Sequence, residues 1–288
     1  LRYNFINFMI IWLSSYPKSG NTWVRSMISS LIFSKSGIFN FELLEQILQF
    51  PDERYFNTFT NDFGNINEIK KYWTRAQEKI NKDNKIRFFK THHLNCKIGG
   101  DSFTNRKNTL ATIYIVRDPR NLIKSISNHF NKSIEDSKDF ILTSRIIAGT
   151  KKDGGMQKDD LKTLIGSWSE HYKFWKNNND NYLLIKYEDL LKNPLEELNR
   201  IIFFLKKFIK IDTNEVKNEN IINTTRFDKL KSMENEGKFK ESVHDSSGKI
   251  KNFFHEGPNN RWQDSLNLNV KNEIEEKLAN EMRELGYL

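Results

Sequence analysis

Residues 14–23 read Ser-Ser-Tyr-Pro-Lys-Ser-Gly-Asn-Thr-Trp and concentrate polar side chains directly after an apolar run. A helix that begins just after Gly20 would present unpaired N–H groups and a positive dipole end, which suits an anion. Gly20 lets the backbone approach a phosphate closely, and Lys18 adds a mobile cation. Further donors stand beside them: Ser19, Asn21 and Thr22. The stretch predicts a phosphate-binding loop, with a serine-capped turn as the plainer alternative; it is not a Walker A motif, because its lysine precedes the glycine.

A second pair of candidate residues is Arg117, which closes another apolar run, and Ser125, eight residues later. Arginine can grip a phosphate through two parallel hydrogen bonds, and a serine two turns into the following helix could reach the same group. Taken alone, the pair favours a surface ion pair between Arg117 and Asp118, with Ser125 a hydroxyl on the helix face. A second phosphate site is the alternative.

A third stretch, residues 88–93, ends in Lys-Thr-His-His. Histidine suits removal of a proton from a hydroxyl or amine near neutral pH. In an extended strand, neighbouring side chains point to opposite faces, so His92 and His93 cannot both face one site. From the residues alone, a histidine here is more often a hydrogen-bonded structural residue, with a general base as the alternative.

These stretches border short apolar runs that predict buried strands at 9–14, 86–89, 112–116 and 182–185. Continuous rather than alternating apolar residues indicate burial on both faces, as in a parallel sheet. Helical patterns occupy 21–33, 66–81, 121–128, 161–176, 194–209 and 269–285, and loops 34–65, 131–160 and 232–262. Strands that alternate with helices predict an α/β fold built from βαβ units.

Composition limits the function classes. The 288 residues include 22 Phe, 9 Tyr and 6 Trp, enough for a sizeable core, and one cysteine excludes a disulfide framework or a cysteine-based zinc site. The net charge of +9 fits a nucleic-acid binder, an anionic surface or an enzyme with polyanionic ligands. Acids interleave the lysines, which argues against nucleic acid. The apolar stretch 5–13 is shorter than the roughly 20 residues that span a bilayer, so we expect no membrane span and a cytoplasmic location.

Together the three stretches resemble the sulfotransferases of cytosolic type that use 3′-phosphoadenosine 5′-phosphosulfate (PAPS). In that family, Tyr-Pro-Lys-Ser-Gly-x-Thr-Trp binds the 5′-phosphosulfate, with Asn21 here in place of a common threonine. A strand-end arginine and a serine eight residues later bind the 3′-phosphate, as Arg117 and Ser125 would. Lys-Thr-His carries the catalytic base. The resemblance implies one domain over 1–288, with a central parallel sheet flanked by helices as in P-loop nucleotide kinases.

The resemblance also implies an adenine site and a late phosphate clamp. Tyr187, Thr225 and Phe227 would contact the base, with Trp23 stacked on it. The family's Arg-Lys-Gly clamp is replaced here by His255-Glu256-Gly257, and an acid beside a phosphate is unfavourable. Either Glu256 turns away or the clamp is weaker. Cations that could substitute are Lys249, Lys251 and Arg261.

The implied reaction moves a sulfuryl group from PAPS to a hydroxyl, or less readily an amine, of a small-molecule or carbohydrate acceptor. Lys18 would stabilise the leaving phosphate, Lys90 the sulfuryl oxygens, and His92 would take the acceptor proton; no metal is needed and no metal-ligand spacing is present. Aromatic residues that could line the acceptor site are Phe39, Phe41, Phe56, Phe59 and Phe130. A P-loop nucleoside or small-molecule kinase and a basic nucleic-acid-binding protein remain alternatives, and the sequence does not fix the oligomeric state.

Overall fold

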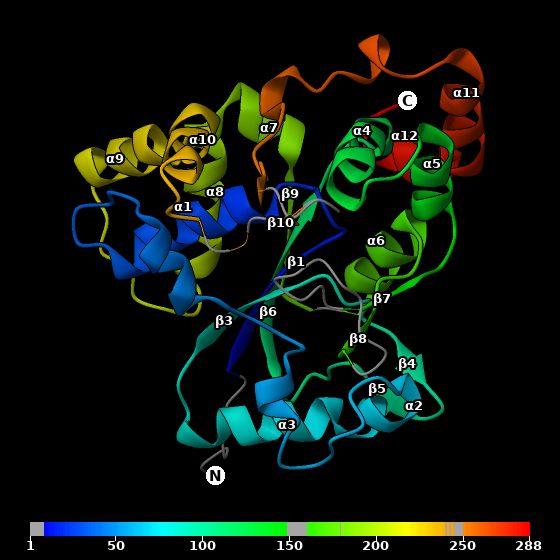
Figure 1. Ribbon diagram of the computed structural model, residues 1–288. Helices are drawn as coiled ribbons and strands as arrows, with labels where there is room; N and C mark the ends of the chain where they lie inside the picture. The colour runs from blue at the N-terminus through cyan, green and yellow to red at the C-terminus, as the bar shows by residue number, and fades with distance from the viewer. Residues whose placement is uncertain (1–8, 149–159, 179, 240, 242, 245–249) are drawn as a thin grey trace.

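A computed structural model describes residues 9–148, 160–178, 180–239, 241, 243–244 and 250–288 (Figure 1). Its centre is a parallel sheet in the order β2-β3-β1-β6-β9. The strands are β1 (Ile10–Ser15), β2 (Leu48–Gln49), β3 (Arg87–Thr91), β6 (Thr109–Val116) and β9 (Tyr182–Lys186). The four predicted strands and the α/β class are confirmed. The edge strand β2, at only two residues, was not foreseen.

Helices cover both faces of the sheet, α1, α8, α9 and α10 on one side and α4, α5, α6, α11 and α12 on the other (Figure 1). The α-helices are α1 (Asn21–Phe33), α2 (Ile66–Ile69), α3 (Trp73–Ile80), α4 (Pro119–Phe130), α5 (Ile134–Leu142), α6 (Trp168–Asn177), α7 (Tyr187–Lys192), α8 (Pro194–Leu205), α9 (Glu215–Thr225), α10 (Phe227–Asn235), α11 (Leu268–Lys277) and α12 (Ala279–Glu284). Short 3-10 turns are η1 (Phe41–Gln46), η2 (Glu53–Tyr55), η3 (Lys70–Tyr72), η4 (Asn81–Asp83), η5 (Gly257–Asn259) and η6 (Trp262–Asp264). Three small antiparallel pairs lie outside the sheet: β4 (Lys97–Ile98) with β5 (Asp101–Ser102), β7 (Ile146–Ala148) with β8 (Lys162–Leu164), and β10 (Val243–His244) with β11 (Ile250–Lys251).

Strand β1 divides the hydrophobic core, because its successive side chains point to opposite faces. Trp12 packs into the cluster with α4, α5, α6 and α11, whereas Ile11 and Leu13 pack into the cluster with α1 and α8. A third cluster joins the 34–65 loop to the late loop and is composed of Phe39, Phe41, Leu44, Leu230, Phe239 and Phe254. The central strand is therefore fixed from both sides, which holds the loop after Ser15 in place.

Several predicted helices differ from the structure. The pattern over 66–81 is interrupted by η3, and that over 269–285 breaks at Leu278. The prediction of a helix over 161–176 is wrong at its start, because Lys162–Leu164 is strand β8. There Gly166 has a positive φ of 64° and Ser167 forms a capping box with Glu170, so the helix begins only at Trp168. The predicted loop 131–160 contains α5, which is capped by Ser133.

Candidate active site and nucleotide site

The loop between β1 and α1 is curled by two residues with positive φ, Lys18 at 68° and Gly20 at 100°. A Cβ on Gly20 would lie 2.6 Å from Cδ2 of Tyr187. Both the backbone conformation and the packing therefore require glycine. The buried hydroxyl of Ser19 has no hydrogen-bond partner among the described residues. A loop of this shape with an unused buried donor at a helix N-terminus fits an anion.

Three cations converge on this loop from three adjacent strands. Lys18 follows β1, Lys90 lies on β3, and Arg117 follows β6. Burial, together with the charges of Arg117 and Lys90, lowers the pKa of Lys18 to about 7. The Lys18 ammonium lies 3.7 Å from the centre of the Phe253 ring. Buried like charges repel one another, so this arrangement suits a bound anion.

Arg117 makes only long contacts in this structure. Its guanidinium nitrogens lie 3.5 Å from Ser125 Oγ and 3.5 Å from the carbonyl oxygens of Lys18 and Gly257. Its Nε is buried with no partner among the described residues. The guanidinium lies 4.1 Å from the centre of the Tyr187 ring. Arg117 and Ser125 are thus brought together as predicted, and the guanidinium keeps donors for a ligand.

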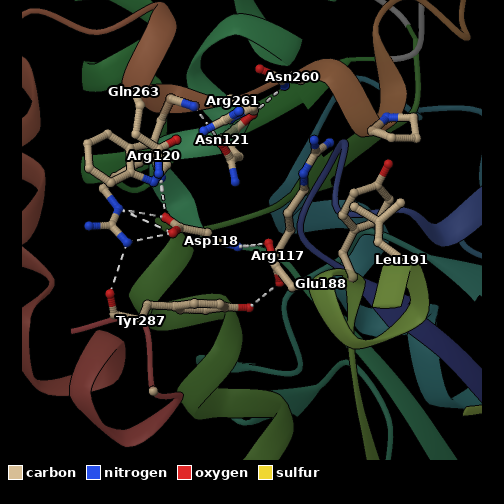
Figure 2. Close-up of a pocket in the computed structure, with 14 residues that line it drawn as sticks. Arg117, Asp118, Arg120, Asn121, Glu188, Leu191, Asn260, Arg261, Gln263 and Tyr287 are labelled. Carbon is tan, nitrogen blue, oxygen red and sulfur yellow. Dashed lines mark hydrogen bonds and ion pairs between the residues drawn. The ribbon is translucent and has the colours of Figure 1, made fainter. Parts of the chain in front are cut away.

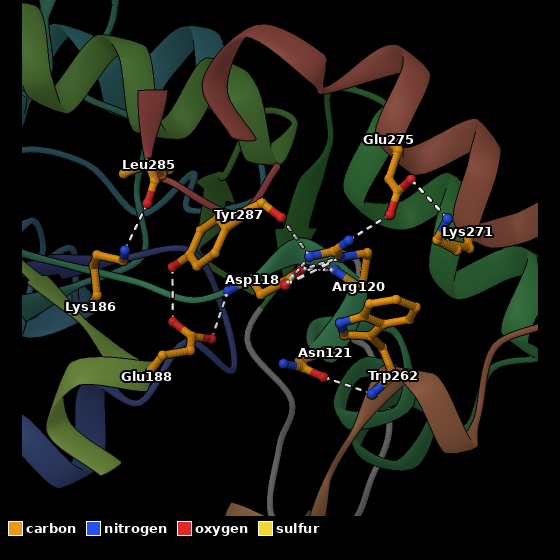
Figure 3. Close-up of polar contacts among 10 residues, drawn as sticks. All are labelled: Asp118, Arg120, Asn121, Lys186, Glu188, Trp262, Lys271, Glu275, Leu285 and Tyr287. Carbon is orange, nitrogen blue, oxygen red and sulfur yellow. Dashed lines mark hydrogen bonds and ion pairs between the residues drawn. The ribbon is translucent and has the colours of Figure 1, made fainter. Parts of the chain in front are cut away.

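The expected ion pair between Arg117 and Asp118 is wrong. Figure 3 shows the Asp118 carboxylate bonded instead to Arg120, at 2.6 Å. Arg120 also reaches Glu275 at 2.5 Å and the Tyr287 carbonyl at 2.9 Å. This network fixes the start of α4 against the C-terminal helices, so Arg117 projects from a rigid base.

A pocket of about 400 Å³ lies beside Arg117 and Tyr187 (Figure 2). Its floor includes Glu188, which accepts hydrogen bonds from the Asp118 N–H at 3.0 Å and the Tyr287 hydroxyl at 2.9 Å. Burial raises the pKa of Glu188. The pocket opens at the Arg117 end of the site rather than at His92.

The residues expected around adenine lie close together. The rings of Trp23 and Tyr187 meet edge to face with centroids 5.7 Å apart. Gly257 has a φ of 54°, and a Cβ there would lie 2.3 Å from Phe227, so the late loop packs directly on that ring. Thr225 is buried, and its hydroxyl donates to the Ile221 carbonyl at 2.7 Å. Thr225 can therefore form part of a wall, but its hydroxyl is already used.

Asn21 also uses its side chain within the protein. Its amide nitrogen lies 3.0 Å from the Leu13 carbonyl oxygen and 3.2 Å from Ser15 Oγ. The expected side-chain contact with the phosphosulfate is thus replaced by a tie between α1 and β1. Thr22 is buried in the first turn of α1, whose leading N–H groups have no intrahelical partner.

His92 is held as a neutral base. Its Nδ1 lies 2.8 Å from the carbonyl oxygen of Ser15, which only accepts, so Nδ1 carries the proton and Nε2 the lone pair. Burial and the charge of Lys90 lower the pKa of His92 to about 3. His93 is fully buried and stacks on Phe103 at 4.2 Å, so it faces away, as predicted.

Helix α6 fixes the backbone of this histidine pair, which sequence reasoning missed. His171 Nε2 lies 3.2 Å from the His92 carbonyl, and Trp175 donates its indole N–H to the His93 carbonyl at 2.9 Å. The Tyr114 hydroxyl lies 2.8 Å from His171 Nδ1. Trp168 and Trp175 are both fully buried. The spacing of His171 and Trp175, one helical turn apart, is the sequence signal that could have revealed their shared polar task.

Two further charged residues at the site had no signal in the sequence. Glu241 forms ion pairs with Lys90 at 3.1 Å and Arg25 at 2.6 Å. The carboxylate lies far along the chain from both cations, so no spacing rule brings them together.

In the late loop, the acid of His255-Glu256-Gly257 forms an ion pair that we did not predict. Glu256 pairs with Lys124 of α4 at 2.6 Å, while the exposed Arg261 faces Asp264 at 3.9 Å. Lys249 lies outside the described residues, as does the side chain of Lys251. Glu256 therefore pairs with a lysine of α4. Of the three cations expected to substitute in the clamp, Arg261 is the one whose side chain is described, and it faces Asp264.

Asn260 supports the same end of the site. Its amide nitrogen lies 2.9 Å from Ser125 Oγ and 2.7 Å from the Asn121 carbonyl. The Ser125 oxygen therefore accepts a hydrogen bond from Asn260, which leaves the hydroxyl proton for a ligand. His255 is half-exposed, and Lys231 donates to its carbonyl at 2.8 Å.

Taken together, a parallel sheet with an anion-binding loop after its central strand and cations at the neighbouring strand ends defines a nucleotide-binding α/β protein of the phosphate-loop kind. The chain belongs to the sulfotransferase domain family, whose model matches residues 10–286. The predicted family is thus confirmed.

The relatives are distant. Cytosolic sulfotransferase 12 of Arabidopsis thaliana is 23% identical over 96% of this chain and 78% of its own length. Sulfotransferase 1C2 of Homo sapiens is 24% identical over 87% of this chain and 75% of its own. No helix in the described ranges is long and apolar enough to cross a bilayer.

Solved structures share the fold. Mouse sulfotransferase SULT7A1 complexed with PAP, adenosine 3′,5′-bisphosphate, has a TM-score of 0.57 at 21% identity, covering 96% of this chain and 85% of that one. Retinol dehydratase in a complex with retinol and PAP has a TM-score of 0.58 at 18% identity, covering 95% and 81%.

Proposed function

We propose that this enzyme transfers the sulfuryl group of PAPS to a hydroxyl, or less readily an amine, of a small-molecule or carbohydrate acceptor and releases PAP. The observation that carries the proposal is the convergence of Lys18, Lys90 and Arg117 on the N-terminus of α1, beside a neutral His92. Three cations suit a ligand with two phosphates and a sulfuryl group.

The residues present fit PAPS at both ends. At the 5′ end, the curled loop offers N–H groups, the unused Ser19 hydroxyl and Lys18. At the 3′ end, Arg117 and Ser125 offer donors to a second phosphate. Between them the ring of Trp23 suits a purine, which stacks well on aromatic rings, and Tyr187 borders Trp23 at a steep angle. The structures of mouse SULT7A1 and retinol dehydratase, both solved with PAP, support this choice.

In the reaction, the acceptor oxygen forms a bond to sulfur while the bond from sulfur to the 5′-phosphate oxygen breaks. Lys18 stabilises the negative charge that grows on the leaving phosphate, and Lys90 neutralises the sulfuryl oxygens. His92 Nε2 receives the acceptor proton. Negative charge from the bound nucleotide favours the imidazolium form, so nucleotide binding raises the low pKa of His92 towards a useful range.

The 3′ end distinguishes PAPS from other nucleotides. Arg117 and Ser125 hold the 3′-phosphate, and Asn260 orients the Ser125 hydroxyl for it. His255 and Gly257 occupy the place of the family's clamp in the late loop, where the Gly257 carbonyl oxygen lies 3.5 Å from Arg117. Lys124 neutralises Glu256, which reduces the repulsion that an acid would cause there.

The acceptor binds near His92, and we expect the loops 34–65, 131–160 and 232–256 to build its pocket. Phe39 and Phe41, which we expected to line the acceptor site, are buried with Phe239 and Phe254 where two of these loops meet. They support an apolar wall from behind, which suits an apolar alcohol or phenol. Retinol dehydratase, solved with retinol and with androsterone, is a relative in fold that binds such alcohols. Phe56 is buried in the main core, so it cannot line the site either. The relatives named cytosolic support a cytoplasmic location, and the family match over 10–286 supports a single domain for 1–288.

A thermal-shift titration with PAP, with ADP and ATP–Mg²⁺ as comparators, tests the proposal. PAP at about 100 times its Kd should add roughly 2.7 kcal/mol of stability, a shift of several degrees. A second step measures sulfuryl transfer from labelled PAPS to a panel of alcohols, phenols and acidic sugars. A larger shift with ATP–Mg²⁺ would favour a kinase, and salt-sensitive binding to DNA or RNA without a PAP shift would favour a nucleic-acid binder.

A further inference from the structure

The acid that pairs with Lys90 comes from the late part of the chain. Glu241 Oε2 lies 3.1 Å from Lys90 Nζ, and Glu241 Oε1 lies 2.6 Å from Arg25 Nη1. The side chains of Arg25 and Lys90 are 6% and 12% exposed, whereas that of Glu241 is 34% exposed. The carboxylate therefore covers two buried cations from the solvent side.

Arg25 anchors this carboxylate independently of Lys90. Its Nη2 donates to the Leu44 carbonyl in η1 at 3.1 Å, so the guanidinium bridges α1 and the 34–65 loop. With one nitrogen on Leu44 and another on Glu241, Arg25 has little freedom to turn. Glu241 is thus held in place by a rigid group and can in turn hold the flexible lysine.

The charges around Lys90 are otherwise positive or neutral. Lys18 after β1 and Arg25 on α1 are cations, His92 on the same segment is neutral, and Glu241 is the acid. Burial lowers the pKa of Lys90, Glu241 opposes that shift, and Arg25 adds to it. Burial also opposes ionisation of Glu241, but Lys90 and Arg25 together lower its pKa to about 2. Without this acid, the buried lysine would lose its proton more readily.

We propose that Glu241 is a positioning residue for sulfuryl transfer: anchored by Arg25, its carboxylate holds Lys90 in place and keeps it charged beside His92. This inference rests on the proposed function, because the proposed function gives Lys90 its task. It goes beyond the proposed function by assigning a role to Arg25 and Glu241, which are not among the proposed nucleotide contacts.

The test compares three variants. Glu241→Gln keeps the shape and removes the charge, and Glu241→Asp keeps the charge. Glu236→Gln is the matched control, since Glu236 forms an exposed pair with Lys238 at 2.6 Å in the same region. For each variant we would measure kcat, the KM for PAPS and the Kd for PAP from about pH 6 to pH 9, a range in which a buried lysine of lowered pKa titrates. The rate of acetylation of Lys90 by acetic anhydride, read by mass spectrometry, reports the lysine's pKa without any turnover.

For Glu241→Gln we expect the upper limb of the kcat profile to move down by about one pH unit, a roughly tenfold loss of kcat at high pH. The acetylation midpoint of Lys90 should move by the same amount, while the Kd for PAP stays within about twofold, because PAP has no sulfuryl group for Lys90 to contact. Glu241→Asp should retain most of the wild-type profile, and Glu236→Gln all of it.

An unchanged acetylation midpoint in Glu241→Gln would overturn the proposal. So would a shifted midpoint with an unchanged kcat profile, or a rise in kcat, which would make the contact inhibitory. If the wild-type chain transfers no sulfuryl group, the proposed function fails, and the acetylation midpoint still supports or refutes the pairing of Glu241 with Lys90.

Discussion

The anion-binding loop between β1 and α1 is a single run, residues 18–23, whereas the Arg117 end of the site draws on five separate parts of the chain. Those parts are the end of β6, helix α4, Tyr187 at the start of α7, the segment at Phe227 and the late loop around Gly257. The first end is fixed by its own backbone, because Lys18 and Gly20 adopt positive φ. The second is fixed only by tertiary contacts, and it is also where this chain departs from its family. When one end of a binding site is assembled from distant parts of the chain, one residue there can change while another compensates for the change.

The first test of this contrast removes His92, the proposed base beside the loop after β1. His92→Ala should lower kcat by about 100- to 10,000-fold, the range of a general base, because it removes the group that takes the acceptor proton. The Kd for PAP should stay within about twofold, since the imidazole binds no phosphate in this scheme. Steady-state kinetics and calorimetry measure the two effects. Near-normal turnover would remove His92 as the base.

The second prediction concerns the Arg117 end of the site, which is assembled from distant parts of the chain. Arg117→Ala should weaken PAP by about 100-fold, the loss of two hydrogen bonds to a charged group, and leave 5′-AMP nearly unchanged. Arg106→Ala is the control, because Arg106 forms only an exposed pair with Asp180. Competition binding gives both constants. Equal losses for PAP and 5′-AMP would place Arg117 at the other phosphate.

The same contrast governs what could be predicted from the sequence. The loop at Lys18 and Gly20, the four main strands and the family were all predictable, because each rests on neighbouring residues and on periodicity. The pairs of Glu256 with Lys124 and of Glu241 with Lys90 were not, because their partners are brought together only by the fold. Asn21 and Thr225 were assigned to the nucleotide by motif, but their side chains bond within the protein. A motif gives residue types, and the hydrogen-bond geometry decides which of them remain available.

A smaller effect follows from the pKa of Lys18, about 7 in the free protein. Bound phosphates favour the protonated lysine and raise this pKa, so PAP binding above pH 7 must take up a proton. The affinity should be highest below about pH 7 and fall by up to tenfold per pH unit above it, until the pKa of the complex is reached. Calorimetry in two buffers of different ionisation enthalpy measures the proton uptake. In Lys18→Met the affinity should be lower, and the part of the pH dependence due to this lysine absent; an unchanged slope would contradict the assignment.

The smallest effect tests the compensation in the late loop. Glu256→Gln removes an acid near the 3′-phosphate and releases Lys124, so PAP should bind about threefold more tightly, as expected for a partly exposed charge. Lys124→Met should weaken PAP by a similar factor. Because the two single effects are opposite and similar in size, their sum predicts a double variant close to the wild-type Kd. Any departure from that sum measures the coupling within the pair, whose charges lie 2.6 Å apart.

Glu68→Gln is the control for this cycle, because Glu68 forms a similar pair with Lys71 far from the site. Raising the salt concentration should shrink both single effects, since partly exposed charges are screened. If Glu256→Gln weakens PAP binding instead, Glu256 stabilises the late loop more than it repels the 3′-phosphate. The change to His255-Glu256-Gly257 would then serve the structure of the late loop. The geometry of the Arg117 end would be as tightly fixed by its contacts as the loop after β1 is by its backbone.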